Sequence, residues 1–115
     1  MTKTPSANPL PMKDRMKVPR QRMPEELPQV RNKQFTEVNL GYTDDLASQE
    51  AVRCIECADP SCVKQCPVGM QIKEIVQFIV QKNYLAAAMK IREDNVLPAI
   101  TGRVCPQEDQ CEGAC

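Results

Sequence analysis

The densest run of cysteines in the chain reads Cys54-Ile55-Glu56-Cys57-Ala58-Asp59-Pro60-Ser61-Cys62-Val63-Lys64-Gln65-Cys66-Pro67. The spacing is C-x2-C-x4-C-x3-C-P. A second group, Cys105-x5-Cys111-x3-Cys115, follows later, and all seven cysteines of the chain belong to these two groups. Packing does not require four thiols within so short a segment. The pattern predicts a cage of thiolates for a soft metal centre.

The composition favours a small domain that depends on a metal centre. A chain of 115 residues holds one domain at most, and with 3% aromatic residues and no Trp it has little bulky core material. A bound metal is one way to stabilise such a domain. The odd number of cysteines argues against a closed disulfide framework, and residues 1–30 lack the apolar segment of a signal peptide. We therefore expect a reducing, cytoplasmic location, and no membrane partner, because no apolar run approaches the ~18 residues of a membrane span.

The ligand types narrow the choice of metal. Histidine is absent, which excludes imidazole bases, Rieske centres and Cys2His2 zinc sites. Thiolates suit both zinc and iron–sulfur clusters, but structural zinc sites usually contain two separate C-x2-4-C pairs. Here only Cys54 and Cys57 form such a pair, so the spacing favours iron–sulfur. The alternative is a zinc-stapled protein-interaction module with a basic docking arm. We assign no catalytic residue.

A net charge of zero hides a basic N-terminal segment. Residues 1–33 hold eight Lys and Arg against three acidic residues, which leaves −5 on residues 34–115. Six of the ten prolines lie within the first 28 residues and predict an extended arm at 1–33. This arm is either a solvated, flexible tail or a segment that wraps a partner or a missing domain. Nucleic acid is not expected, because the arm has no interleaved aromatics and residues 34–115 are acidic.

The pattern of residues 34–115 predicts an all-α domain. Thr43 is expected to cap a helix whose first turn holds Asp44 and Asp45. The inner face of that helix should lead into the first thiol through Ala47, Ala51 and Cys54. Residues 58–69 are expected to form a loop, because they contain Pro60, Pro67 and Gly69.

Two further helices are predicted to pack against each other. Residues 71–82 carry the apolar stripe of an amphipathic helix at Ile72, Ile75, Val76, Ile79 and Val80. Asn83 can cap a second helix from Tyr84 to about Glu93, and the short connection makes the pair antiparallel. Asn95, Pro98 and Gly102 should then break the chain and lead it to the second cysteine group. No strand pattern competes.

Together these motifs resemble a known family. The first motif extends from Arg53 through the four cysteines to Val68, and the second reads Gly102-Arg103-Val104-Cys105-Pro106-Gln107-Glu108-x2-Cys111-Glu112-x2-Cys115. They closely resemble the N-terminal iron–sulfur domain of the glutamate synthase small subunit. The same domain occurs in the large subunit of NADH-dependent ferredoxin:NADP oxidoreductase and in dihydropyrimidine dehydrogenase. Residues 31–42 are also similar to this domain.

The resemblance implies an α-helical ferredoxin-type fold with two [4Fe-4S] clusters held by loops between short helices. In the family, electrons pass from NAD(P)H through FAD to the clusters and on to an acceptor such as the FMN of a large subunit. The chain has no dinucleotide-binding fingerprint, since its glycines are far apart at Gly41, Gly69, Gly102 and Gly113. We expect the FAD and NAD(P)H sites on a missing domain or a separate subunit, so that this chain alone carries electron transfer within a larger oxidoreductase.

The spacing also divides the cysteines between two clusters. In the bacterial ferredoxin run that ends C-x3-C-P, the last cysteine binds the other cluster. Applied to both groups, this rule assigns the first cluster to Cys54, Cys57, Cys62 and Cys115. The second cluster then keeps Cys66, Cys105 and Cys111, which is one ligand short. The resemblance gives the same partition, with a Glu or Gln beyond Cys115 as the eighth ligand. Glu108 or Glu112 could substitute, but a carboxylate is a hard ligand for iron held by thiolates.

Residues near the cysteines are expected to tune the clusters. Backbone N–H groups in the loops around Gly69 and Gly113 could donate hydrogen bonds to sulfur and raise the potential. Arg103 lies two residues before Cys105. It either offsets cluster charge or forms a surface ion pair with an acid such as Glu108.

Overall fold

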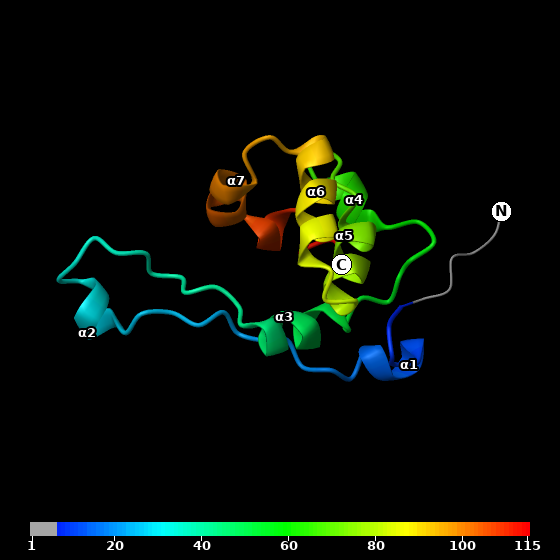
Figure 1. Ribbon diagram of the computed structural model, residues 1–115, viewed down its shortest axis with the longest axis horizontal. Coiled ribbons are helices and arrows are strands. Elements are labelled where there is room, and N and C mark those ends of the chain that lie inside the picture. Colours follow the sequence, from blue (N-terminus) through cyan, green and yellow to red (C-terminus); the bar gives the residue numbers. More distant parts are fainter. Residues whose placement is uncertain (1–6) are drawn as a thin grey trace.

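The computed structural model describes residues 7–115, in which the regular elements are helices joined by loops, without a sheet (Figure 1). This confirms the all-α prediction. The elements in chain order are α1 (Met12–Arg15), α2 (Pro28–Arg31), α3 (Asp44–Ala51), α4 (Ser61–Gln65), α5 (Ile72–Val80), α6 (Tyr84–Asp94), α7 (Pro98–Val104) and a 3-10 turn (Gln107–Asp109).

The centre of the molecule is the antiparallel pair of α5 and α6, which lie side by side in Figure 1. The apolar stripe of α5 makes this contact, and Ile75 of α5 and Ala87 of α6 are buried. Asn83 caps α6, because its side chain accepts a hydrogen bond from the Ala86 N–H at 3.2 Å. Helix α5 also packs against α3 and α4. The prediction of this helical pair is confirmed.

Helix α3 begins directly after Thr43, the cap residue that the sequence predicted. The Thr43 hydroxyl accepts a hydrogen bond from the Leu46 N–H at 3.3 Å, and Asp44 and Asp45 occupy the first turn. The helix ends at Ala51, whose side chain is buried, and the chain reaches Cys54 through one further turn. The predicted inner face therefore leads into the first thiol, but the thiol itself lies beyond the helix.

Two proline-rich segments fold differently from the prediction. Residues 58–69 were expected to be a loop, yet α4 forms within them, directly after Pro60. Asn95, Pro98 and Gly102 were expected to break the chain. Asn95 does end α6, but Pro98 and Gly102 lie within α7, with Pro98 in its first turn and Gly102 inside it. A proline in the first turn costs nothing, because the N–H that it lacks would have no partner within the helix. A single interior glycine weakens a helix without preventing it.

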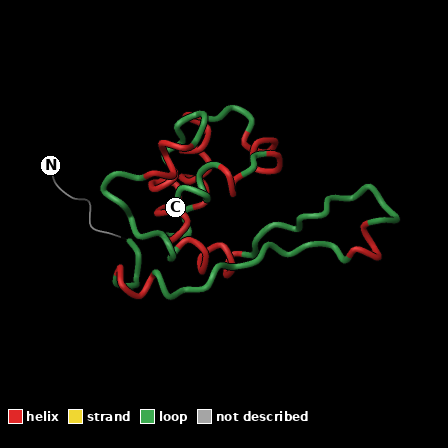
Figure 2. The backbone as a smooth tube through the Cα atoms, turned by 180° about the vertical axis from the view of Figure 1, so that it is seen from behind, coloured by secondary structure: helices red, strands yellow, loops and turns green. Residues whose placement is uncertain are grey.

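The N-terminal segment makes a long excursion away from the helices. Two cross-strand hydrogen bonds, Glu26 N–H to Val38 O at 2.9 Å and Leu40 N–H to Pro24 O at 2.8 Å, join its two legs. We call residues 24–40 the hairpin; α2 forms its tip in Figures 1 and 2. The hairpin gives the molecule its elongated shape, 54 × 30 × 27 Å.

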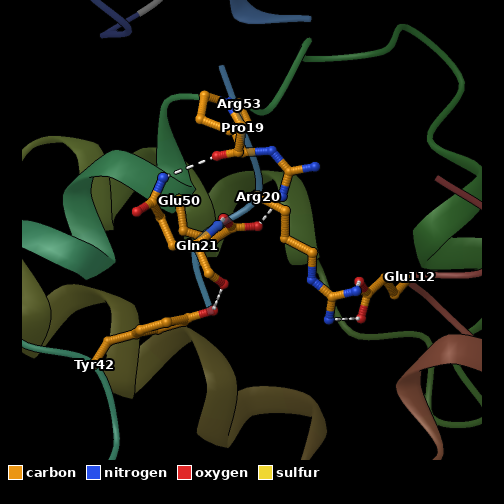
Figure 3. A network of polar contacts seen from close by, with 7 residues as sticks. All are labelled: Pro19, Arg20, Gln21, Tyr42, Glu50, Arg53 and Glu112. Atoms are coloured by element: carbon orange, nitrogen blue, oxygen red, sulfur yellow. Dashed lines mark hydrogen bonds and ion pairs between the residues drawn. The ribbon is translucent and has the colours of Figure 1, made fainter. Parts of the chain in front are cut away.

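Polar contacts fasten the base of this excursion to the helices (Figure 3). The backbone N–H of Gln21 donates to the Glu50 carboxylate at 2.8 Å, and the Gln21 carbonyl accepts from the Tyr42 hydroxyl at 2.8 Å. Arg20 donates to the Glu112 carboxylate at 3.0 Å. Residues 20 and 21 are therefore attached to α3, to Tyr42 just before it, and to the last cysteine group.

The apolar core is very small. In residues 7–115 the buried hydrophobic side chains are Ala51, Ile75 and Ala87, and no large side chain is fully buried. Such a core contributes little to the free energy of folding at roughly 25 cal/mol per Å² of buried apolar surface. None of the helices in the described part of the chain has the length and apolar character that a membrane crossing requires.

Candidate metal centre

The first cysteine group lies on one continuous stretch between α3 and α5. Cys54 follows α3 by one turn, since its N–H donates to the Ala51 carbonyl at 3.1 Å. Cys57 lies in the irregular segment that follows, and Cys62 lies within α4. Cys66 ends α4 with an extended backbone, φ −75° and ψ 122°, so that the chain turns away at Pro67.

The second group follows α7. Cys105 ends that helix, and the 3-10 turn separates it from Cys111 and Cys115. The chain folds tightly back here: a Cβ atom on Gly113 would clash with the Glu108 carbonyl oxygen, so only glycine fits. This close approach brings the segment from Cys111 to Cys115 back against the backbone at Glu108.

The electrostatics connect the first cysteine group to the end of the chain. Burial is the main cause that raises the pKa of the Cys54 thiol, and the charges of Glu56, Cys115 and Cys57 raise it further. Burial also raises the pKa of Cys62, followed by the charges of Cys115, Cys54 and Cys57. Each of these two thiols is therefore influenced by the same set of neighbouring thiols, although Cys115 is remote in sequence.

Cys66 and Cys111 form a second set of neighbouring thiols. Burial raises the pKa of the Cys111 thiol, and the charge of Cys66 adds to this effect, while backbone N–H groups at Cys111 and Glu112 lower the pKa. Cys66 is the last residue of the first group in sequence, yet the neighbour that it influences belongs to the second group. The thiols whose pKa is raised stay protonated until a metal replaces the proton.

The donor set fits an iron–sulfur cluster. Among residues 7–115, no three side chains of Cys, Asp or Glu approach closely enough to hold a single metal ion. A cubane cluster presents its irons at separate corners, so its thiolate ligands stand further apart than the ligands of one ion. All seven cysteines are free thiols, and thiolates are the ligands that iron–sulfur clusters take.

Two cations near the first group were not predicted from the sequence. The Arg15 guanidinium donates to the Cys54 carbonyl at 3.0 Å, and the Lys73 ammonium donates to the Cys57 carbonyl at 3.2 Å. Arg15 is 39 residues from Cys54 in the chain. No local pattern in the sequence could have indicated this contact, because it depends on how the arm returns to the helices.

The groups that were predicted to tune the clusters have partners in the structure. The N–H of Gly69 donates to the Cys66 carbonyl, and the N–H of Gly113 donates to the Gln107 carbonyl. Hydrogen bonds from the backbone at Glu112 and Cys111 lower the pKa of the Cys111 thiol, which agrees with the prediction for the loop around Gly113. Arg103 forms the expected ion pair, but with Glu37 of the hairpin rather than with Glu108. Glu112 pairs with Arg20, which argues against Glu112 as a cluster ligand.

Comparison with known proteins identifies the family. Residues 31–115 match the family described as dihydropyrimidine dehydrogenase domain II, 4Fe-4S cluster. The chain belongs to this family. The match covers both cysteine groups and all the helices from α3 onward. It confirms the resemblance seen in the cysteine motifs, and it makes this an iron–sulfur-binding domain.

Related proteins contain this domain as a small part of a longer chain. A glutamate synthase [NADPH] small chain from Halomonas elongata is 41% identical over 93 residues, which is 80% of this chain and 20% of the relative. The putative oxidoreductase AegA of Escherichia coli is 42% identical over 82 residues, 70% of this chain and 12% of the relative. An NAD-dependent dihydropyrimidine dehydrogenase subunit PreT from Salmonella typhimurium is 39% identical, over 69% of this chain and 19% of its own length. The chain thus spans about a fifth or less of these relatives. One of these relatives is named an oxidoreductase, and the other two are named as parts of an NADPH-linked synthase and an NAD-dependent dehydrogenase.

Proposed function

We propose that the chain relays electrons through two [4Fe-4S] clusters. Cys54, Cys57, Cys62 and Cys115 would hold the first cluster, and Cys66, Cys105 and Cys111 the second. The observation that carries this proposal is the match of residues 31–115 to a 4Fe-4S domain family, in a segment that holds all seven free thiols. The division between the clusters is supported by the thiols that raise the pKa of one another: Cys115 acts on Cys54 and Cys62, and Cys66 acts on Cys111. When bound, a [4Fe-4S] cluster accepts and returns one electron at a time.

The electron donor in this proposal is an FAD reduced by NAD(P)H on another domain or subunit. The acceptor is a further redox site, such as FMN on the large subunit of a glutamate-synthase-like complex. The names of the relatives support this, because they include an NADPH-linked glutamate synthase small chain and an NAD-dependent dehydrogenase subunit. Because free thiols and iron–sulfur clusters persist in a reducing compartment, we place the protein in the cytoplasm.

The two parts of the chain have separate roles in this proposal. Residues 34–115 would form the cluster domain, and the basic residues 1–33 an arm that contacts the flavoprotein. Support comes from the hairpin, which starts within the arm and extends to residue 40, and which exposes apolar side chains at Leu27, Phe35 and Leu40. A hollow of about 260 Å³ lies between the base of the hairpin and α7, with Met23, Leu40 and Gly102 in its wall. Exposed apolar groups around a hollow are typical of a surface that another protein covers.

Metal analysis tests the central part of the proposal. Protein purified without oxygen should be brown and should contain roughly eight irons and eight sulfides per chain, because each cluster holds four of each. Electron paramagnetic resonance after reduction should then detect two clusters. Stoichiometric zinc without sulfide, persisting after anaerobic reconstitution with iron and sulfide, would instead support the zinc-stapled module.

A further inference from the structure

Arg15 is the most deeply buried charged side chain in the described part of the chain. Its relative exposure is 6%, although it lies in an arm in which most side chains are exposed. A buried guanidinium is costly unless its donors are satisfied. The partners of Arg15 therefore indicate what the residue holds in place.

The guanidinium joins the arm to the backbone of the first cysteine pair. Its Nε donates to the Leu10 carbonyl at 2.8 Å, and its Nη1 donates to the Cys54 carbonyl at 3.0 Å. The same Nη1 lies 3.2 Å from the Glu56 carboxylate. A second contact supports this attachment, since the Asn8 amide donates to the Val52 carbonyl at 2.9 Å.

The segment that Arg15 holds has an uncommon backbone conformation. Glu56 lies between Cys54 and Cys57 and has φ +55°, in the left-handed region that residues other than glycine rarely adopt. Such a conformation persists only where surrounding contacts enforce it. The Arg15 contacts to the Cys54 carbonyl and to the Glu56 side chain hold this segment before and at that residue, and Lys73 holds the Cys57 carbonyl after it.

We propose that Arg15 is a positioning residue for the first cluster: it fixes the Cys54–Cys57 turn for ligation and balances the Glu56 carboxylate beside it. This inference rests on the proposed function, because it takes Cys54 and Cys57 as ligands. Groups of this kind, which orient ligands without binding metal, typically change metal affinity by about tenfold to hundredfold when removed. Charge close to a cluster also sets its reduction potential.

The test compares Arg15→Met with Lys17→Met in the full chain, reconstituted without oxygen. Lys17 lies in the same arm segment and makes only an exposed ion pair with Asp14, at 2.9 Å, so its variant controls for loss of a nearby positive charge. We expect Arg15→Met to accelerate iron release from one cluster to a chelator by at least about tenfold. The midpoint potential of that cluster should fall, because the Glu56 carboxylate loses its Arg15 partner. Lys17→Met should change neither quantity.

Two further variants separate charge from position. Arg15→Met combined with Glu56→Gln removes both charges, so the potential should return towards that of the wild type while iron release stays fast. Arg15→Lys keeps the charge but lacks the planar fork that reaches Leu10 and Cys54 together. It should therefore keep the potential while releasing iron faster than the wild type, and it serves as the test if Arg15→Met does not fold.

Cys54→Ser identifies the cluster concerned. If Cys54→Ser abolishes one signal, and the Arg15 variants leave the potential and the iron release of that cluster unchanged, the positioning role is wrong. A loss of thermal stability with both clusters otherwise unaltered also overturns it, since it reveals a purely structural residue. If Cys54→Ser leaves every cluster intact, the ligand assignment of the proposed function fails instead.

Discussion

The α5–α6 pair and the N-terminal arm are held in place by opposite kinds of contact. The pair buries the apolar side chains of Ile75 and Ala87 between neighbouring helices joined by a three-residue turn. The arm buries almost no apolar surface and is attached by polar side chains that reach backbone carbonyls and carboxylates, among them Asn8, Arg15 and Arg20. The pair is therefore a local structure, and the arm is a long-range one.

The difference determines what each region depends on. Several anchors of the arm lie in or beside the cysteine-bearing segments, at Val52, Cys54, Glu56 and Glu112. If the clusters order those segments, they also order the arm. The helical pair depends less on such support, because its own apolar stripe and the Asn83 cap stabilise it.

Removal of the clusters should have the largest effect and should separate the two regions most clearly. Metal binding supplies much of the folding free energy in small metal-stapled domains, and the apolar core here is very small. Apo protein should lose the order of the cysteine loops and the attachment of the arm together, while part of α5 and α6 persists. Limited proteolysis with hydrogen exchange would measure this. A cooperative apo melt equal to that of the loaded protein, with the arm still protected, would contradict it.

Single cysteine variants should each abolish one cluster. Cys54→Ser and Cys115→Ser are expected to damage the same paramagnetic signal, and Cys66→Ser the other, although Cys66 is only four residues after Cys62. The physical reason is that α4 ends in an extended backbone at Cys66, which directs the chain away from the first three thiols. Electron paramagnetic resonance on the three reduced variants decides this. A signal shared by Cys54 and Cys66 but not Cys115 would mean sequential ligation.

Truncation of the buried Ile75 side chain tests how the helical pair is held together. Ile75→Ala should lower the free energy of unfolding by about 2–4 kcal/mol, because it removes methyl groups from the small core. Leu85→Ala on the exposed face of α6 is the control and should change it by roughly 0.5 kcal/mol or less. Denaturant unfolding of the cluster-loaded protein measures both. Equal effects would show that the pair is not held by this face.

The exposed hairpin should matter for association rather than for cluster content. If it docks the flavoprotein, Phe35→Ser should weaken binding about tenfold, since an apolar anchor that becomes buried in an interface is worth roughly 1–2 kcal/mol. Phe35 is fully exposed and distant from the anchors of the arm, so iron content should not change. Val96→Ser, on an exposed residue outside the hairpin, is the matched control. Affinity unaffected by Phe35→Ser at low and moderate salt would exclude the hairpin as the docking surface.

The ion pair between Arg103 and Glu37 should have the smallest effect. A hydrogen bond from Arg103 holds the pKa of the Glu37 carboxyl below its ordinary value of 4.5. A carboxyl group whose pKa is lowered in the folded protein contributes stability that is fully present above its ordinary pKa. This stability is lost as the pH falls through the lowered pKa. Nuclear magnetic resonance titration of Glu37 should show this, and Arg103→Gln should return the inflection to the ordinary range. An inflection that Arg103→Gln does not move would contradict the pairing. Exposed pairs of this kind contribute little to stability.

Local patterns predicted the elements whose causes lie within a few residues. The Thr43 and Asn83 caps act over three residues, and the stripe that includes Ile75 repeats with each helical turn, so α3, α5 and α6 could be read directly. The cysteine spacings predicted an iron–sulfur domain, and the family match confirms this. Helices α4 and α7 were not predicted, because proline was interpreted only as a residue that ends helices. Proline also favours the start of a helix, as at Pro60 and Pro98.

The amino-acid sequence by itself determined the thiol donors, the helical pair and the kind of centre that the thiols can hold. Only the tertiary structure decided which residues, distant in sequence, contact one another around the thiols and the helices. Arg15 meets a carbonyl 39 residues away, Arg103 pairs across 66 residues, and Arg20 across 92. The physical reason is that helix periodicity and capping act within one or two turns, whereas the partner of a long charged side chain depends on the path of the whole chain.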